Sequence, residues 1–272
     1  MKLLTINTHS LLEENYNEKC NEFVLGILTH QPDVIAMQEV NQTFSEDIID
    51  NQDFLGDVPL RKDNYAVKIG HMLQENGIKY HMIWVGIKQG YGKFEEGLAF
   101  LTKHPFSNAE AFQISTCNEF DNWKTRKGLL LKCGADWFCN VHLGWWNDGE
   151  EPFTAHWQRV NDKLHSYENI YLMGDFNSPS NIKGEGYDTV RSFGWNDTYQ
   201  DAKIKDEGHT VIGNIAGWSE NDTLCKMRID YIFSKQKENV ISSVRLFNNI
   251  NGKEISDHYG VLVDIERENK LL

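Results

Sequence analysis

Short apolar or alternating runs recur along the whole chain, and residues that favour turns separate them. Helical periodicity is rarer, and its first instance lies between two strand-like runs. Because strands outnumber helices, the pattern favours an α/β protein in which two sheets pack face to face with helices outside. The runs predict strands over residues 2–7, 33–38, 80–85, 98–102, 128–133, 137–143, 170–174, 229–233 and 259–265, and helices over 19–28, 63–76 and 153–165.

No feature of the chain marks a domain boundary, since no internal repeat, low-complexity tract or Pro/Ser-rich linker interrupts the pattern. A chain of 272 residues is long enough for one large layered domain or two small ones. We therefore predict one domain over residues 1–272. The composition, 40% hydrophobic and 25% charged, is that of an ordinary globular protein and demands no special class.

Residues that bind metal or phosphate recur where the apolar strands end. A carboxylate or amide at one such position is usually a turn former or a helix cap. The repetition argues against chance, because strand ends are rigid mounts and side chains gathered at one rim can converge. The residues concerned are Asn7, Gln38-Glu39, His142, Asp175, Asn177, Asp230 and Asp257-His258.

These residue types suit the hydrolysis of a phosphate ester. A hard cation such as Mg²⁺ takes oxygen ligands and is often anchored by one or two carboxylates, and Glu39 fits that position. The reaction also needs a base for the attacking water and donors around the phosphoryl oxygens. A histidine beside a carboxylate provides the base, and an asparagine can donate to phosphate without adding negative charge.

The same motifs, in the same order, resemble the endonuclease/exonuclease/phosphatase superfamily, to which deoxyribonuclease I belongs. The resemblance runs from Asn7 to His258, nearly the whole chain. It implies a four-layer α/β sandwich, in which two packed mixed β-sheets are flanked by helices and the site lies at the rim of the sheets. The matching motifs are Asn7, Gln38-Glu39, Val141-His142-Leu143, Gly174-Asp175-Phe176-Asn177, Arg228-Ile229-Asp230-Tyr231-Ile232-Phe233 and Ser256-Asp257-His258.

The resemblance also implies a role for each matching residue. Glu39 becomes the main ligand of Mg²⁺, for which Mn²⁺ can substitute, with Asn7 beside it. Asp257 binds or positions the metal through water. His258 activates the attacking water and is oriented by Asp230.

The remaining motif residues are implied to handle the phosphoryl group. Asp175 and Asn177 hold it or the nucleophile, and family members differ on whether Asp175 or His258 is the base. His142 contacts phosphate or helps the leaving group to depart. The segment 95–99 resembles the one that supplies the carboxylate partner of this histidine, and we assign that role to Glu96.

The substrate is predicted less directly than the reaction. Abasic-site enzymes of the family usually carry tyrosine at the position of His142, and no membrane-inserting hairpin like that of the sphingomyelinases is evident. Residues 7–10 and 142–146 are similar to a group of bacterial cytosolic members that includes a relative of maltose 6′-phosphate phosphatase. We predict a small phosphomonoester such as a sugar phosphate. A nuclease or phosphodiesterase would use the same catalytic residues, and a non-catalytic binding module would be expected to have lost some of them.

Net charge and cysteine content limit which binding partners and which cellular compartment we expect for the protein. The net charge of −13 and the lack of a Lys/Arg cluster disfavour nucleic acid as a partner. Five scattered cysteines without CxxC spacing argue against disulfides and zinc. No apolar run is long enough to span a bilayer, and the short N-terminal run reads as a strand rather than a signal, so we expect a cytoplasmic protein without membrane contact. Oligomeric state stays open.

A few further residues have two readings each. Trp145 and Trp146 either form an aromatic platform for a substrate ring or cap the core. Arg126 either clamps phosphate or forms a solvated charge pair with Lys127. Residues 208–218 are a candidate specificity loop. The histidines without a matching motif, among them His9 and His156, are interpreted as surface or packing residues.

Overall fold

The structure is a computed structural model that describes residues 1–213 and 226–267. Its strands form an eight-stranded sheet and a six-stranded sheet. In the larger sheet the strands follow one another in space as β11 (Ile204–Lys205), β13 (Val240–Leu246), β14 (Gly260–Ile265), β1 (Lys2–Asn7), β2 (Val34–Thr43), β5 (Phe94–Thr102), β4 (His81–Gly90) and β3 (Phe54–Leu55). In the smaller they are β10 (Asn196–Asp197), β12 (Asp230–Ser234), β9 (Ile170–Asp175), β8 (Asp136–His142), β7 (Lys127–Cys133) and β6 (Phe106–Gln113).

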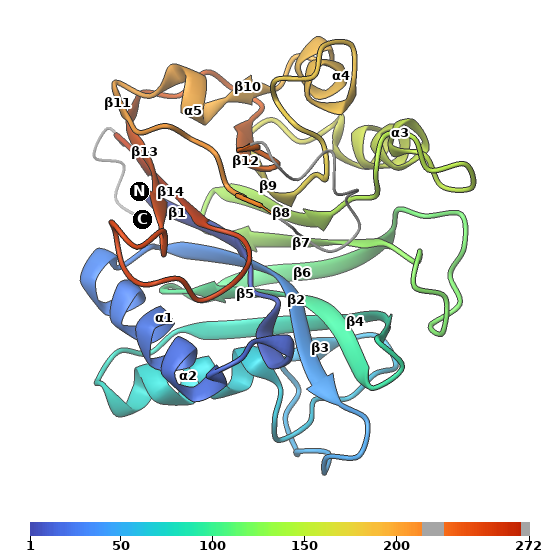
Figure 1. Cartoon of the computed structure of the whole chain (residues 1–272), viewed down its shortest axis with the longest axis vertical. Helices are drawn as coiled ribbons and strands as arrows, with labels where there is room; N and C mark the ends of the chain where they lie inside the picture. Colours follow the sequence, from blue (N-terminus) through green and yellow to red (C-terminus); the bar gives the residue numbers. More distant parts are fainter. Residues whose placement is uncertain (214–225, 268–272) are drawn as a thin grey trace.

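Both sheets are mixed. In the larger one β1 pairs with β2 in parallel and with β14 in the antiparallel sense. In the smaller one β8 pairs with β9 in parallel, and β9 pairs with β12 in the antiparallel sense. The four longer helices lie on the outer faces, and a fifth, short helix contacts both β12 and β13, which belong to different sheets (Figure 1). They are α1 (Tyr16–His30), α2 (Tyr65–Glu75), α3 (Phe153–Leu164), α4 (Gly186–Ser192) and α5 (Thr198–Asp201), with one short 3₁₀ turn at η1 (Ser10–Leu12).

Alternation along the strands explains the layers. Successive side chains of a strand point to opposite faces, and here both faces are covered. In β1, Leu3 packs between the two sheets, whereas Leu4 packs toward α1 and α2. The central core joins apolar residues of the larger sheet, such as Phe100, to those of the smaller, such as Phe138. The outer face of the smaller sheet packs on α3 and α4 through Trp157 and its neighbours. The predicted four-layer α/β sandwich is confirmed.

A buried polar bridge joins the two sheets close to their rim. The side chain of Asn140 in β8 accepts a hydrogen bond from Gln38 Nε2 in β2, at 2.7 Å. Its own amide donates to the carbonyls of Met37 and Ala99, at 2.9 and 3.0 Å. Both Asn140 and Gln38 are fully buried. In a low-dielectric interior these contacts favour one relative placement of the layers, since sliding would break all three hydrogen bonds.

All the predicted strands and helices occur, with ends that shift by several residues at β2, β4, β5 and α1. The pattern did not predict β6, β13, α4 or the short strands at the sheet edges. Strand β6 reads Phe-Ser-Asn-Ala-Glu-Ala-Phe-Gln and is largely exposed, so no apolar alternation marks it. Strand β13 carries two serines in its centre. Edge strands are recruited by pairing with a neighbour rather than by their own composition.

Candidate active site

Polar strand ends from both sheets meet at one rim. Asn7 ends β1 and faces Gln38 of β2 in the parallel register. His142 ends β8 and faces Asp175, the end of β9. Asp230 begins β12 and faces Asp175 from the other side. Because the β1–β2 pair and the β8–β9 pair belong to different sheets, the rim brings together residues that are remote in sequence.

His258 and Asp230 form a buried pair. His258 Nδ1 lies 2.9 Å from Asp230 Oδ2, and both side chains are almost fully buried. Burial by itself lowers the pKa of His258, but the hydrogen-bonded Asp230 and the nearby Asp175 raise it well above the usual value. A carboxylate on Nδ1 leaves Nε2 free to take a proton from a ligand. The predicted orientation of His258 by Asp230 agrees with this geometry.

Asp175 lies at the centre of the cluster. Its Oδ2 accepts a hydrogen bond from Asn7 Nδ2 at 3.1 Å, and its Oδ1 accepts one from the backbone N–H of Asn177 at 2.8 Å. The same Oδ2 lies 3.6 Å from His142 Nε2 and 3.8 Å from His258 Nε2. Burial, followed by the neighbouring Asp230, raises the pKa of Asp175. Asp175 therefore contacts both histidines that the sequence assigns to the reaction.

Glu39 owes its position to a β-bulge. The register of β2 against β5 shifts between Met37 and Val40, and Glu39 has a φ of 51°, in the left-handed region that residues other than glycine rarely adopt. The bulge turns the Glu39 carboxylate toward Asn7, whose Nδ2 lies 2.9 Å from Glu39 Oε1. An extra residue inserted into a strand is a common device for aiming a side chain into an active site.

The carboxylates around Glu39 suit a divalent cation. Burial, then the nearby Glu96 and Asp257, raise the pKa of Glu39. Glu39 and Asp257 line the same cavity. Carboxylates that repel one another in a buried site are relieved by a hard cation, which takes oxygen ligands. Among the described residues, the ligand atoms of two sets of cavity or adjacent residues are close enough to share an ion, namely His9 with Glu13 and Asp257, and Asp175 with Asp230 and His258; Glu39 belongs to neither set.

Glu96 does not pair with His142 in the described part of the chain, contrary to the sequence prediction. It faces Lys88 directly across the β4–β5 hairpin, and the two form an ion pair of 3.1 Å between Nζ and Oε1. Opposite charges on directly opposed strand positions attract one another. The carboxylate beside His142 is that of Asp175. Burial, then the cations Arg126 and Lys88, lower the pKa of His142 well below its usual value.

A cavity of about 420 Å³ opens over this cluster. Beside the acids and histidines it is lined by two cations and by aromatic side chains at its mouth. Trp123 and Tyr91 are 52% and 61% exposed there, and the ring of Trp145 lies 6.1 Å from that of Trp123. The lining residues are His9, Glu39, Lys88, Gln89, Gly90, Tyr91, Glu96, Trp123, Arg126, His142, Trp145, Asp175, Asn177, Asp257 and His258.

The two predicted tryptophans separate in the structure. Trp145 lines the cavity, but Trp146 packs against Phe153 at the start of α3, with ring centroids 6.0 Å apart. The chain turns after Trp145, whose carbonyl accepts a hydrogen bond from the Asp148 N–H, and the turn directs the two side chains to different places. The interpretation of Trp146 as part of an aromatic platform for the substrate is therefore wrong, because its side chain packs against the apolar cluster between the smaller sheet and α3.

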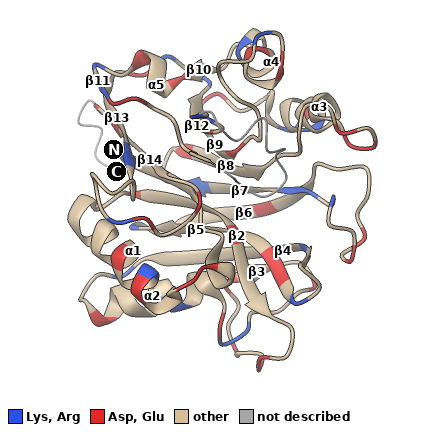
Figure 2. Ribbon diagram, in the orientation of Figure 1, with Lys and Arg blue, Asp and Glu red and all other residues tan. Residues whose placement is uncertain are grey.

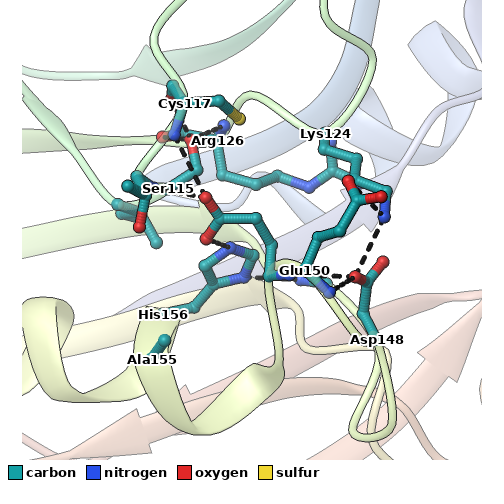
Figure 3. A network of polar contacts seen from close by, with 12 residues as sticks. Ser115, Cys117, Lys124, Arg126, Asp148, Glu150, Ala155 and His156 are labelled. Atoms are coloured by element: carbon teal, nitrogen blue, oxygen red, sulfur yellow. Dashed lines mark hydrogen bonds and ion pairs between the residues drawn. The ribbon is translucent and has the colours of Figure 1, made fainter.

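Arg126 is buried in the wall of the cavity, so the reading of a solvated charge pair is wrong. Its Nη1 donates to the carbonyls of Trp123 and Thr125, at 3.0 and 3.2 Å. Figure 3 shows it within a polar network that connects segment 115–126 to segment 148–156. In that network Glu151 accepts hydrogen bonds from the backbone of Thr116 and Cys117.

The sequence analysis missed the cavity-lining residues Lys88 and Tyr91, together with Gln89 and Gly90 between them, and His9. The first two lie on the β4–β5 hairpin, whose Gly90-Tyr91-Gly92-Lys93 turn is a recognisable signal. Extending the two predicted strands to that turn would have placed Lys88 opposite Glu96. His9 precedes η1 with a φ of 46°, which no sequence signal indicated. Of the proposed specificity loop, residues 214–218 lie outside the described residues.

Comparisons with known proteins agree with this architecture. The model of the Endonuclease/Exonuclease/phosphatase family matches residues 4–258. A solved endonuclease/exonuclease/phosphatase family protein from Leptotrichia buccalis C-1013-b is 33% identical, with a TM-score of 0.84 over 98% of this chain and 100% of that one. Curated protein sequences include no match.

Two more distant structures share the fold. A mannosyl-6-phosphatase from Bacteroides thetaiotaomicron VPI-5482 is 15% identical with a TM-score of 0.63, and a 3′-5′ exonuclease from Neisseria meningitidis is 16% identical with a TM-score of 0.65. In both comparisons the match covers 98% of this chain and 100% of the other. None of the helices in residues 1–213 and 226–267 combines the length and apolar character that crossing a bilayer requires.

Proposed function

The chain belongs to the endonuclease/exonuclease/phosphatase family, and on that premise we propose that it is a Mg²⁺-dependent phosphatase that acts on a small phosphomonoester such as a sugar phosphate. Members of this family hydrolyse phosphoric esters and generally depend on a divalent metal. The observation that carries the proposal is the composition of one cavity, in which acids and histidines lie beside two buried cations and exposed aromatic rings.

Glu39 and Asp257 are the residues proposed to hold the metal, with Asn7 fixing the orientation of the Glu39 carboxylate through its side-chain amide. When bound, Mg²⁺ or Mn²⁺ neutralises charge on the phosphoryl oxygens and positions the ester. With only these two carboxylates as ligands, a bound ion would keep positions for water and for oxygens of the substrate.

The proton from the attacking water is proposed to pass to Nε2 of His258. Asp230, hydrogen-bonded to Nδ1, orients the ring and stabilises the imidazolium that forms when Nε2 takes the proton. Asp175 faces the same Nε2 at 3.8 Å, which supports a role in orienting the water. Which of the two groups acts as the base is decided by their relative pKa values with substrate and metal in place.

His142 is proposed to act as a neutral hydrogen-bond donor. Because burial and two cations hold its pKa well below the usual value, its ring is uncharged at neutral pH. A neutral imidazole presents one N–H, which suits a phosphoryl or leaving-group oxygen. Asn177 adds a side-chain amide that donates to the carbonyl of Leu143, at 3.0 Å, and so ties the end of β8 to the segment after β9.

The aromatic side chains at the mouth support a sugar or another ring as the leaving group. Trp123 and Tyr91 expose large apolar faces next to the acids, and Trp145 lies behind Trp123. Exposed aromatic faces beside a polar site are suited to stacking on rings. The net charge of −13 disfavours a long polyanion, and Figure 2 shows Lys and Arg scattered among Asp and Glu over the chain.

The test is a comparison of kcat/KM at one Mg²⁺ concentration and one ionic strength. Disaccharide phosphates, monosaccharide phosphates, a bis-ester reporter and plasmid DNA are run side by side. We expect a sugar phosphate to be the best substrate and excess EDTA to abolish its hydrolysis. Faster plasmid nicking or bis-ester cleavage than hydrolysis of every monoester would instead favour a nuclease or phosphodiesterase.

A further inference from the structure

Lys88 is a buried cation to which no step above assigns a contact with the substrate. Its side chain is 10% exposed, lies on β4 and lines the cavity. The ammonium pairs with Glu96 at 3.1 Å. Burying an ammonium costs free energy even when it is paired, and a pair of apolar residues would serve the hairpin at least as well. The position therefore calls for a reason beyond the stability of the hairpin.

Arg126 is the second buried cation of the same cavity, and part of its guanidinium has no partner. The residue is 4% exposed, and Nη1 is held by two backbone carbonyls. Its Nε has no hydrogen-bond partner among the described residues. A buried, unsatisfied guanidinium N–H costs free energy that an anionic ligand would recover. The backbone around Arg126 is fixed by Ser115, whose Oγ accepts from the Arg126 N–H at 2.7 Å.

The two cations are close enough to affect one another and the same histidine. Arg126 adds to burial in lowering the pKa of Lys88, and both cations add to burial in lowering that of His142. Like charges gathered in a buried place oppose folding, and such arrangements are typical of sites that bind the opposite charge. The nearby acids balance the cations only in part, since Glu39 and Asp257 are the residues assigned to the metal.

We propose that Lys88 and Arg126 form an anion-binding pair that recognises the terminal phosphate of a monoester and so selects monoesters over diesters. The proposal rests on the proposed function. At neutral pH a phosphomonoester is close to a dianion with three terminal oxygens, whereas a diester is a monoanion with two. Two positive donors beside the metal match the additional charge and the additional oxygen, and the arginine fork suits phosphate geometry.

A purely structural role for Lys88, as counter-ion of Glu96, makes a different prediction. If Lys88 only neutralises Glu96, replacing both residues by neutral ones removes the unpaired charge and restores activity. If Lys88 binds phosphate, the double replacement leaves activity low. The double variant Lys88→Met/Glu96→Gln also keeps the hairpin free of a buried unpaired carboxylate, so it is expected to fold even where Lys88→Met does not.

The experiment compares 4-nitrophenyl phosphate with methyl 4-nitrophenyl phosphate, which share a leaving group and differ by one methyl. For Lys88→Met, Arg126→Met and the double variant, kcat/KM for the monoester should fall about thirtyfold, the loss expected from one charge-assisted hydrogen bond. The diester value should change by less than about threefold, since its missing oxygen makes no such bond. Lys88→Arg and Glu96→Gln serve as the charge-retaining and partner-only controls, and thermal unfolding verifies folding.

Inorganic phosphate is the second probe, and its inhibition constant is measured with whichever ester each variant hydrolyses. The constant should rise about thirtyfold in the two Met variants and in the double variant. Any of three results would contradict the proposed anion-binding pair. They are equal losses of kcat/KM for both esters, wild-type monoester activity in the double variant, and an unchanged inhibition constant for inorganic phosphate. If the wild type prefers diesters while the phosphate constant still rises, the proposed monoesterase function fails and the anion-binding pair stands.

Discussion

Glu39 combines backbone strain with electrostatic repulsion, two costs that a residue kept only for stability would not carry. Its φ is positive, and burial with two nearby carboxylates raises its pKa. A carboxylate whose pKa is higher in the folded state than in the unfolded state opposes folding at any pH at which it is ionised. Function and stability therefore make opposite demands on this residue, as is common at active sites.

Replacing Glu39 should separate the two demands. Glu39→Ala is expected to lower kcat by more than about a hundredfold with Mg²⁺ present, because the main carboxylate proposed for the metal is gone. Its unfolding temperature should equal or exceed that of the wild type, since the repulsion is relieved. Enzyme assays and thermal unfolding test both parts, with Glu75→Ala, on the exposed end of α2, as the matched control. Full activity of the Glu39→Ala variant would contradict the assignment of Glu39 as the main metal ligand.

The pair of His258 and Asp230 makes a prediction about pH. Since Asp230 raises the pKa of His258, Asp230→Asn should lower that pKa, and the acid limb of kcat/KM should move to lower pH. The maximal rate should fall by about a hundredfold, as in His258→Ala, because the ring loses its orientation. The measurement is a pH profile of both variants beside the wild type. A profile and rate like the wild type for Asp230→Asn would mean that the pair has no part in the reaction.

Individual residues show which parts of the site could be predicted from the sequence and which could not. Motif residues such as Asp175 and His258 were identified because each follows or precedes a recognisable strand. The partner of Glu96 was misassigned because cross-strand pairing depends on where the hairpin turns, and the predicted strands stopped short of the turn that places Lys88 opposite Glu96. Trp146 was misassigned because two adjacent identical residues carry no information about which one faces inward.

At the scale of elements, the strands with both faces buried were predictable and the sheet edges were not. Strands such as β9 read as unbroken apolar runs, since each face packs on its own layer. In β6 and β13 the polar residues break that pattern, and their strand conformation comes from pairing with β7 and β14. Helix α4 is only seven residues long and too short for periodicity to mark it.

Gly174 is the residue of β9 whose replacement should be felt most strongly. It has a φ of 141°, and a Cβ there would lie 1.9 Å from the carbonyl oxygen of Val141 on β8. Gly174→Ala should therefore destabilise the fold by about 3 kcal/mol or more, with a fall in unfolding temperature of about 10 °C.

Gly70 offers the contrasting control. It lies inside α2 with no atom within 4 Å of an added Cβ. Gly70→Ala should stabilise the protein slightly, by about 0.5–1 kcal/mol, because alanine loses less conformational entropy in a helix. Thermal or denaturant unfolding compares the two variants. A Gly174→Ala protein as stable as the wild type would show that β8 and β9 can separate at the rim without loss.

At the scale of the whole molecule, the site depends on how the two sheets are placed. Glu39 and Asn7 extend from the larger sheet and Asp175 from the smaller, and the 3.1 Å contact between Asn7 and Asp175 crosses from one to the other. The bridge between Gln38 and Asn140 lies immediately behind this contact. A small displacement of one sheet against the other would open the cluster even if each strand stayed intact.

Asn140→Ala tests that dependence. Removing the side chain takes away one acceptor of Gln38 Nε2, which keeps its bond to Thr5 Oγ1, and one donor to each of two buried carbonyls. The unfolding free energy should therefore fall by about 3 kcal/mol. Activity should fall as well at temperatures where the variant is still folded. Asn108→Ala, at an exposed position of β6 in the same sheet, should change neither quantity. Loss of stability with unchanged kcat would mean that the cluster keeps its geometry without the bridge.

The residues that line the cavity come from two kinds of structural element, and this difference affects how the substrate of such a protein can change during evolution. Except for His9, the acids and histidines lie in central strands or next to them, whereas Arg126, Trp123 and Trp145 belong to connecting segments and Tyr91 to a hairpin tip. Connecting segments tolerate substitutions and insertions far better than central strands do. A lineage can therefore exchange one substrate for another by altering these segments while the hydrolytic chemistry is inherited unchanged.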